Sequence, residues 1–367
     1  MTASTRRGQA AAAAGLVLGL LGGVAVPARA ASPGLSVFEA FAASRTVTMA
    51  PRAAAVISLV VEQYVGATHA VVDSAPRAQG YAATYGVPVA SDFRGAGIPV
   101  SYGGQCYANY PGEAQVDCGV PAPGVVAPRP PQGGPLDGGV LYAQAKANGD
   151  PVDPEKLTAS GDTESGGLRL NDVVDIGFSR SRSHTFIDDK GVHALTASAA
   201  KDIQVGTALH IASISAIAEA FHGGDLKGAT GKASTDVEGV TIGGVPVVIG
   251  PEGVMVQGTK LAEAKTPDAE AVRAAMAGQG LTIEPLTAPV VTKDQSTGYV
   301  NATASGFAVL MRRPTGDRFD ITFGYATARA TATRATPAQS DSDLLLHGQQ
   351  AAAWPGLPAG RLESEAA

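Results

Sequence analysis

Histidine, cysteine, serine and the carboxylates are the residues of this chain that could perform chemistry. The chain has six histidines, and they are widely spaced: His69, His184, His193, His210, His222 and His347. No His-Glu-x-x-His motif occurs, although His193 could approach His210 from a neighbouring strand. No Gly-x-Ser-x-Gly motif occurs either, and the spacing of the carboxylates selects no glycosidase pair. We therefore predict no catalytic residue, no metal ligand and no cofactor.

Two arginines form the most distinctive charged pattern. Arg180 and Arg182 alternate with serines in a segment of extended character, so on a strand both would lie on the same face. Such a face could bind an anionic ligand, or it could be an ordinary solvated strand face. The sequence alone leaves both interpretations open.

Cys106 and Cys118 are the only cysteines. A zinc site would require further soft ligands nearby, and a redox pair would favour a two-residue gap. In an oxidising compartment, two isolated cysteines separated by a segment with proline and glycine indicate one structural disulfide. We predict a Cys106–Cys118 disulfide.

The first thirty residues have the three-part pattern of a secretory signal peptide. Arg6 and Arg7 precede an apolar run over residues 10–26, and Ala28 and Ala30 are small residues at the positions read by a signal peptidase. Cleavage is expected before Ala31. Glycines dilute the apolar run, which makes a transmembrane anchor the weaker alternative. The chain is therefore predicted to be secreted, extracellular or associated with the cell wall, with no transmembrane anchor after removal of the signal.

The charge balance argues against a nucleic-acid partner. The full chain has 27 basic and 33 acidic residues, and removal of the signal takes away three arginines and no acids. The mature protein would be acidic, and its sequence shows no basic stripe interleaved with aromatic residues. Charged and aromatic residues are few while glycine is abundant, which favours flat, closely packed sheets of small side chains.

Alternating patterns predict a mainly β protein. The turn at residues 188–191 and the turn at residues 314–317 separate segments of extended character. Residues 208–221 fit an apolar helical stripe about as well as a buried strand, and flanking hairpin signals favour the strand. Thr266 as a cap, Pro267 at the first helical position and acids in the first turn predict one amphipathic helix over residues 266–278.

The pattern suggests five segments along the chain. We expect a signal peptide (1–30), an N-terminal β segment with the disulfide loop (31–119), a Pro/Gly-rich linker or loop (120–138), a main β-rich domain (139–335) and a disordered tail (336–367). The expected fold class is mainly β (α+β), with an antiparallel sheet or sandwich-like domain and one helix. Whether the N-terminal and C-terminal β segments form one sheet or two domains stays open.

Residues 202–214, the glycine-rich return at residues 240–253 and the later helix with its strand pair resemble secreted bacterial proteins of the choice-of-anchor P family. Tyr110, Pro111 and Gly112 add to this resemblance, which covers roughly residues 170–310. It implies an actinobacterial-type secreted β protein without assigned activity, and it identifies no catalytic residue. The chain has no recognisable C-terminal anchor.

The function that we expect is a structural or interaction module of the cell envelope, without enzymatic activity. Two alternatives stay open. The first is an extracellular carrier of an apolar, lipid-like ligand, for which the apolar run at residues 56–61 could line a cavity. The second is an unrecognised secreted hydrolase.

Overall fold

The computed structural model describes residues 34–52, 63–86, 105–112, 115–118, 136–137, 140–149 and 156–334. The predicted signal peptide, most of the predicted linker, the apolar run at residues 56–61 and the predicted disordered tail lie outside these residues. Within them the protein is mainly β with one short helix, which confirms the predicted fold class.

One nine-stranded antiparallel sheet, sheet A, combines the two ends of the described chain. Its strands lie in the order β17-β20-β21-β1-β2-β3-β4, while β19 also pairs with β21 and β18 pairs with β19. The strand bounds are β1 (Leu35–Arg52), β2 (Gln63–Asp73), β3 (Arg77–Gly86), β4 (Gln105–Tyr110), β17 (Leu281–Ile283), β18 (Val290–Asp294), β19 (Tyr299–Ser305), β20 (Ala308–Arg312) and β21 (Arg318–Arg334).

A second nine-stranded antiparallel sheet, sheet B, is built from the middle of the chain. Its order is β13-β12-β11-β10-β9-β8-β7-β5, with β6 paired to β8. The bounds are β5 (Gln115–Cys118), β6 (Leu136–Asp137), β7 (Val140–Asn148), β8 (Thr158–Leu170), β9 (Val174–Asp188), β10 (Gly191–Val205), β11 (Leu209–His222), β12 (Thr230–Ile242) and β13 (Val245–Pro246). A small third sheet contains β14 (Val248–Gly250), β15 (Gly253–Val256) and β16 (Thr259–Lys260).

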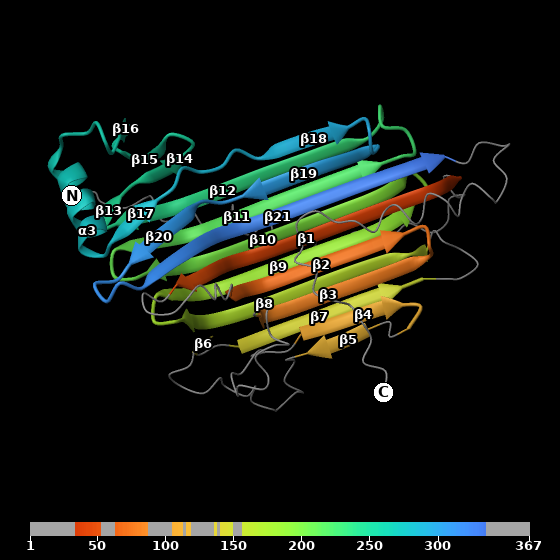
Figure 1. The fold of residues 1–367 in the computed structure, drawn as a ribbon, viewed down its shortest axis with the longest axis horizontal. Helices are drawn as coiled ribbons and strands as arrows, with labels where there is room; N and C mark the ends of the chain where they lie inside the picture. The colour runs from red at the N-terminus through yellow and green to blue at the C-terminus, as the bar shows by residue number, and fades with distance from the viewer. Residues whose placement is uncertain are drawn as a thin grey trace, which may run out of the picture.

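Sheets A and B pack face to face as a long two-layer sandwich (Figure 1). Strand β1 lies against β9 and β10, and its neighbour β21 lies against β10 and β11. Because β1 is hydrogen-bonded to β21 along almost its whole length, β1–β4 of the N-terminal segment lie in the same sheet as β17–β21 near the C-terminal end of the described chain. Strand β5 of the N-terminal segment and the strands β6–β13 lie in the facing sheet.

The helix α3 (Pro267–Gly278) lies with the small third sheet at one end of the sandwich (Figure 1). Thr266 caps it, since its side chain accepts a hydrogen bond from the backbone N–H of Ala269. Asp268 and Glu270 lie in the first turn, where the helix dipole favours negative charge. The predicted helix is confirmed.

The ambiguous segment at residues 208–221 is a strand, β11 (Leu209–His222). Its residues alternate strictly between buried and half-buried over the second half of the strand, and β10 and β12 flank it on both sides. The apparent helical stripe arises because isoleucine and alanine occupy both faces of this strand. Pairing with a strand on each side therefore decides the secondary structure of this segment, although its local pattern also fits a helix.

A line of matched irregularities, which we call the crease, crosses both sheets. In sheet B the regular pairing is skipped at corresponding positions of five strands: Gly167, Gly177, Asp202, Ala212 and Gly239. In sheet A it is skipped at Thr84, Gly66, Thr46 and Gly324. In every second strand the residue at the crease has a positive φ, between 51° and 69°. Four of the five residues with this backbone conformation are glycines, which adopt it readily, and the fifth is Asp202.

The crease shifts which residues of a strand point into the sandwich. On β1, Ala42 and Ser44 are buried on one side of the crease, and Val47 and Met49 are buried on the other. The residues that point inward therefore change from even-numbered to odd-numbered positions. The same change occurs on neighbouring strands at matching positions. The crease therefore divides the interior into two halves while both sheets remain continuous.

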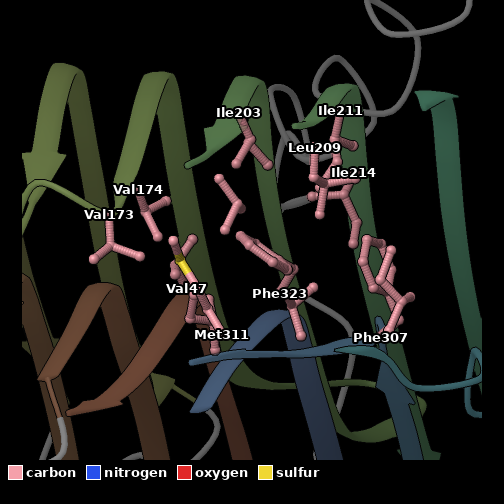
Figure 2. Close-up of a cluster of buried hydrophobic side chains, with 14 of the residues drawn as sticks. Val47, Val173, Val174, Ile203, Leu209, Ile211, Ile214, Phe307, Met311 and Phe323 are labelled. Carbon is pink, nitrogen blue, oxygen red and sulfur yellow. The ribbon is translucent and has the colours of Figure 1, made fainter. Parts of the chain in front are cut away.

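One half of the interior has a core of large side chains. Figure 2 shows Val47, Met311 and Phe323 of sheet A, with Phe307 from the connection between β19 and β20, facing side chains of sheet B that include Ile203, Leu209, Ile211 and Ile214. The rings of Phe307 and Phe323 lie 5.6 Å apart, and both side chains are fully buried. This half of the core also receives Val272 from α3.

The other half of the core consists mostly of alanine. Here the sheets approach so closely that backbone of one sheet faces glycine of the other. A Cβ atom on Gly161 would lie 2.0 Å from the carbonyl oxygen of Tyr81, and one on Gly80 would lie 2.4 Å from that of Ser160. The small-residue composition thus produces the close packing that the sequence predicted.

Buried hydroxyl groups connect the two sheets near the crease. Thr68 Oγ1 of sheet A lies 2.8 Å from Ser183 Oγ of sheet B, which lies 2.9 Å from Thr196 Oγ1. A second connection joins Thr46 Oγ1 to Ser181 Oγ at 2.8 Å. Because each hydroxyl has a partner, these polar groups are buried without the penalty of an unmade hydrogen bond.

The two cysteines lie on the outer strands of opposite sheets, at the same margin of the sandwich. Cys106 is buried on β4, with Sγ 3.5 Å from the carbonyl oxygen of Ala143. Cys118 on β5 is paired in the backbone register with this same Ala143. This placement is compatible with a link between the sheets; the disulfide stays a prediction, because the side chain of Cys118 is outside the described part.

Candidate binding face on sheet B

The outer face of sheet B presents side chains in rows that cross the strands. One row runs Thr158, Phe186, His193, Phe221 and Thr230 from β8 to β12, according to the pairing register. The next row runs Ser160, His184, Leu195, Glu219 and Lys232. In an antiparallel sheet, directly paired residues have side chains on the same face and in contact.

Four rings on this face are in successive contact, two contacts stacked and the third tilted by 44°. We call them the aromatic strip: His184, Phe186, His193 and Phe221. Adjacent ring centroids lie 4.9, 4.5 and 4.8 Å apart, and the rings of Phe186 and His193 are within 4° of parallel. All four side chains are half-buried. The strip thus offers ring surface to solvent from three adjacent strands.

Polar contacts fix the two histidines of the strip. His193 Nε2 lies 3.0 Å from Asp188 Oδ1, and His184 Nε2 lies 2.9 Å from Thr158 Oγ1. Burial, reinforced by the charge of His193, lowers the pKa of His184 to about 4. His184 is therefore a neutral aromatic ring at pH 7.

Asp188 closes the turn between β9 and β10. Its Oδ1 atom accepts hydrogen bonds from the backbone N–H groups of Lys190 and Gly191. Burial alone would raise the pKa of Asp188, but these bonds and the contact with His193 outweigh it and lower the pKa. A carboxylate that is ionised at neutral pH therefore lies beside His193 of the strip.

Arg180 and Arg182 lie on this face, in the two rows beyond His184, as the alternation predicted. Arg182 Nε lies 2.7 Å from Asp162 Oδ2, and Arg180 Nη2 lies 3.4 Å from the same atom. Glu164 Oε2 is 3.9 Å from Arg180 Nε. Two carboxylates on β8 thus balance the two arginines, so this face has no excess of positive charge at these rows. The anionic-ligand patch stays a prediction that the geometry does not favour.

Sheet A carries a second aromatic ladder on its opposite outer face. The ring centroids of Phe41 and His69 lie 6.5 Å apart, those of His69 and Tyr81 4.7 Å, and those of Tyr81 and Tyr107 4.8 Å. The hydroxyls of Tyr64 and Tyr81 are 2.7 Å apart. Burial and the neighbouring Tyr64 raise the pKa of Tyr81, while Tyr107 is 45% exposed.

The structure separates His193 from His210, which the sequence suggested could meet. His193 is paired with Phe221 and Phe186, whereas His210 is paired with Gln204 near the other end of β10. In the described ranges, no three His, Cys, Asp or Glu side chains gather in a way that could hold a metal ion.

Sequence reasoning missed the aromatic strip. The spacing of His184 and Phe186 on one strand was visible as alternation, but His193 and Phe221 join them only through the pairing of three strands. That register follows from turn positions and from the crease, which a single strand pattern does not reveal.

Acidification should destabilise the fold between about pH 6.5 and pH 4. Burial, with the nearby charge of Arg45, lowers the pKa of His69 to about 4, as burial does for His184. The unfolded chain then binds more protons than the folded one in this window, so the free energy of unfolding falls as pH falls. Each histidine should contribute roughly 1–3 kcal/mol. Urea unfolding at a series of pH values measures this slope.

Asp162 should have the opposite effect on the pH dependence of stability, and it therefore serves as a control. Burial outweighs the charge and hydrogen bond of Arg180 and raises the pKa of Asp162 to about 6, so its contribution to stability decreases as pH rises through 3.8–6. Replacing both histidines by phenylalanine should flatten the profile, whereas Asp162→Asn should steepen it. A wild-type profile without slope from pH 6.5 to pH 4 would contradict this assignment.

Among the residues that the structure describes, no helix has the length and apolar character needed to cross a membrane. No family model matches the chain, and no curated protein matches its sequence. The resemblance to the choice-of-anchor P family therefore stays a prediction.

Proposed function

We propose that this protein is an extracellular interaction module that binds an uncharged glycan of the cell envelope on the outer face of sheet B. The observation that carries the proposal is the aromatic strip, a chain of four half-buried rings in successive contact on the outer face of sheet B. Extracellular placement rests on the predicted signal peptide.

The chemistry of the face fits a sugar chain. One side of a pyranose ring presents C–H groups that pack against an aromatic ring, while its hydroxyls seek polar partners at the ring edge. Asp188 lies beside His193 of the strip, and the Arg182–Asp162 pair lies in the next row beyond His184. A few polar groups beside an apolar platform are typical of sites that orient a small ligand.

The charge balance of the face favours an uncharged ligand. The positive charges of Arg180 and Arg182 are matched by Asp162 and Glu164, so a polyanion would gain little net attraction. His184 adds no positive charge at neutral pH because burial holds its pKa at about 4.

The interior gives no support to the alternative of a lipid carrier. In the alanine half, backbone atoms of the two sheets approach so closely that a single methyl group at Gly161 or Gly80 would collide with them. In the other half, large buried side chains such as Phe323 and Leu209 pack together between the sheets. An apolar ligand between the sheets would require their separation along the described strands.

Binding to purified cell-envelope polysaccharide, measured by co-sedimentation, tests the proposal. Phe221→Ala and Phe186→Ala should each lower the affinity about tenfold, because each removes a ring worth roughly 1–1.5 kcal/mol of contact. Tyr325→Ala removes a 37% exposed ring from the outer face of sheet A and serves as the matched control. Circular dichroism establishes that each variant is folded.

Two results would reject the proposal. The first is absence of glycan binding by the folded wild type, and the second is equal binding by both phenylalanine variants and the wild type. Loss of binding with Tyr325→Ala alone would move the site to sheet A.

A further inference from the structure

The long strand β12 has one edge without a strand partner over most of its length. It pairs with β11 on one side, and on the other side β13 reaches only Thr241 and Ile242. The stretch from Thr230 to Glu238 therefore has an open edge among the described strands. Lys232, Ser234 and Asp236 on this stretch are exposed. An exposed edge of this length is a template for pairing with another strand.

The charges along this edge complement themselves when the strand is reversed. If two copies of β12 pair antiparallel with Ser234 opposite Ser234, Lys232 of each copy faces Asp236 of the other. Cross-strand pairs of opposite charge stabilise a sheet, whereas like charges directly opposite destabilise it. Lys232 and Asp236 have no ion pair within the described part of the chain, so both remain available.

Small residues at the centre of this register permit close approach. On the inward face of the strand, Ala233 would face Thr235 and Gly231 would face Val237 of the other copy. A two-fold axis through Ser234 makes the interface isologous, since each surface meets its own copy. Shifting the axis to Lys232 or Asp236 would place like charges opposite each other.

Exposed valines of sheet A stand at the same margin. Strand β18 pairs only with β19, and its Val290 and Val291 are 49% and 44% exposed. Val291 lies beside Gly231, since a Cβ atom there would be 2.8 Å from its Cγ1 atom. Figure 1 shows β18 and β12 along the same margin of the sandwich, opposite β4 and β5. Pairing of two β12 edges would bring two β18 strands together.

We propose that the chain forms a two-fold dimer through antiparallel pairing of the β12 edges, with Lys232 of each copy opposite Asp236 of the other. Sheet B would then continue from one copy into the next. The outer faces of sheet B would form one surface, with the aromatic strip of each copy on it. This proposal rests on the edge strand and is independent of any glycan ligand.

Sedimentation velocity of the purified chain tests the dimer directly. The wild type should dimerise, and Asp236→Lys should lower the association constant about tenfold or more, because two attractive pairs become two repulsive ones. Lys232→Asp should act in the same direction. The double variant Lys232→Asp/Asp236→Lys restores opposite charges and should restore the dimer.

Asp236→Lys is the cleaner single variant, since Asp236 faces Ser215 within its own sheet whereas Lys232 faces Glu219. Lys265→Asp changes the charge of an exposed residue outside the edge and should leave the dimer unchanged. A wild type that stays monomeric at its highest soluble concentration would overturn the proposal. So would a dimer that both single variants leave intact, because it would use another surface.

Discussion

Gly161→Ala should lower the free energy of unfolding by about 3 kcal/mol, although it adds a single methyl group. The added Cβ would lie 2.0 Å from the carbonyl oxygen of Tyr81 on the facing sheet. A flexible side chain could move away, but this neighbour is backbone within a paired strand, so the two sheets would have to separate locally. Urea unfolding followed by circular dichroism gives the change in stability.

Gly166→Ala is the matched control on the same strand. Gly166 has no positive φ, and its nearest neighbour would be the carbonyl oxygen of Gly177 at 3.6 Å, an ordinary contact. The control should change stability by less than about 1 kcal/mol. If both variants were equally stable, the close approach of the two sheets in the alanine half would be refuted.

Local chemistry made part of this fold predictable. Thr266, Pro267 and the acidic first turn specify the start of α3. Thr266 accepts a hydrogen bond from a free N–H group, Pro267 has no N–H that needs a partner, and the acids interact with the helix dipole. Alternation specified long strands, and the scarcity of large side chains indicated close sheets. These features depend on residues that are near one another in the sequence.

Pairing between distant segments was beyond the sequence. Strand β1 pairs with β21, which lies near the other end of the described chain. The local sequence pattern of either strand does not identify the strand with which it pairs. The crease was also hidden, because the parity change at Thr46 and Asp202 appears as broken alternation within one strand. Only alignment of such breaks across neighbouring strands reveals a continuous feature.

The crease explains how one sandwich contains two kinds of core. Alanine and glycine bring the sheets together on one side, while phenylalanine, isoleucine and leucine hold them apart on the other. A sheet that must change its spacing needs a place where its strands can bend. Residues with positive φ, mostly glycine, supply that bend at the same position in alternate strands.

Opposite mutational sensitivities should therefore exist in the two halves. In the alanine half, substitutions that enlarge a side chain should lower the free energy of unfolding, as expected for Gly161→Ala. In the other half, substitutions that shorten a side chain should lower it. Phe323→Ala should lower the free energy of unfolding by about 3–5 kcal/mol, because it removes a fully buried ring that packs against Phe307. Thermal and urea unfolding of the purified variant measure this loss.

Tyr325→Ala is the control for this truncation, because Tyr325 lies two residues further along β21 on the other side of Gly324. Its ring is 37% exposed on the outer face, so its removal leaves no cavity and should cost less than about 1 kcal/mol. The two aromatic residues differ in burial because the crease at Gly324 turns one inward and the other outward. Equal losses for the two variants would show that the crease does not separate core from surface at this point.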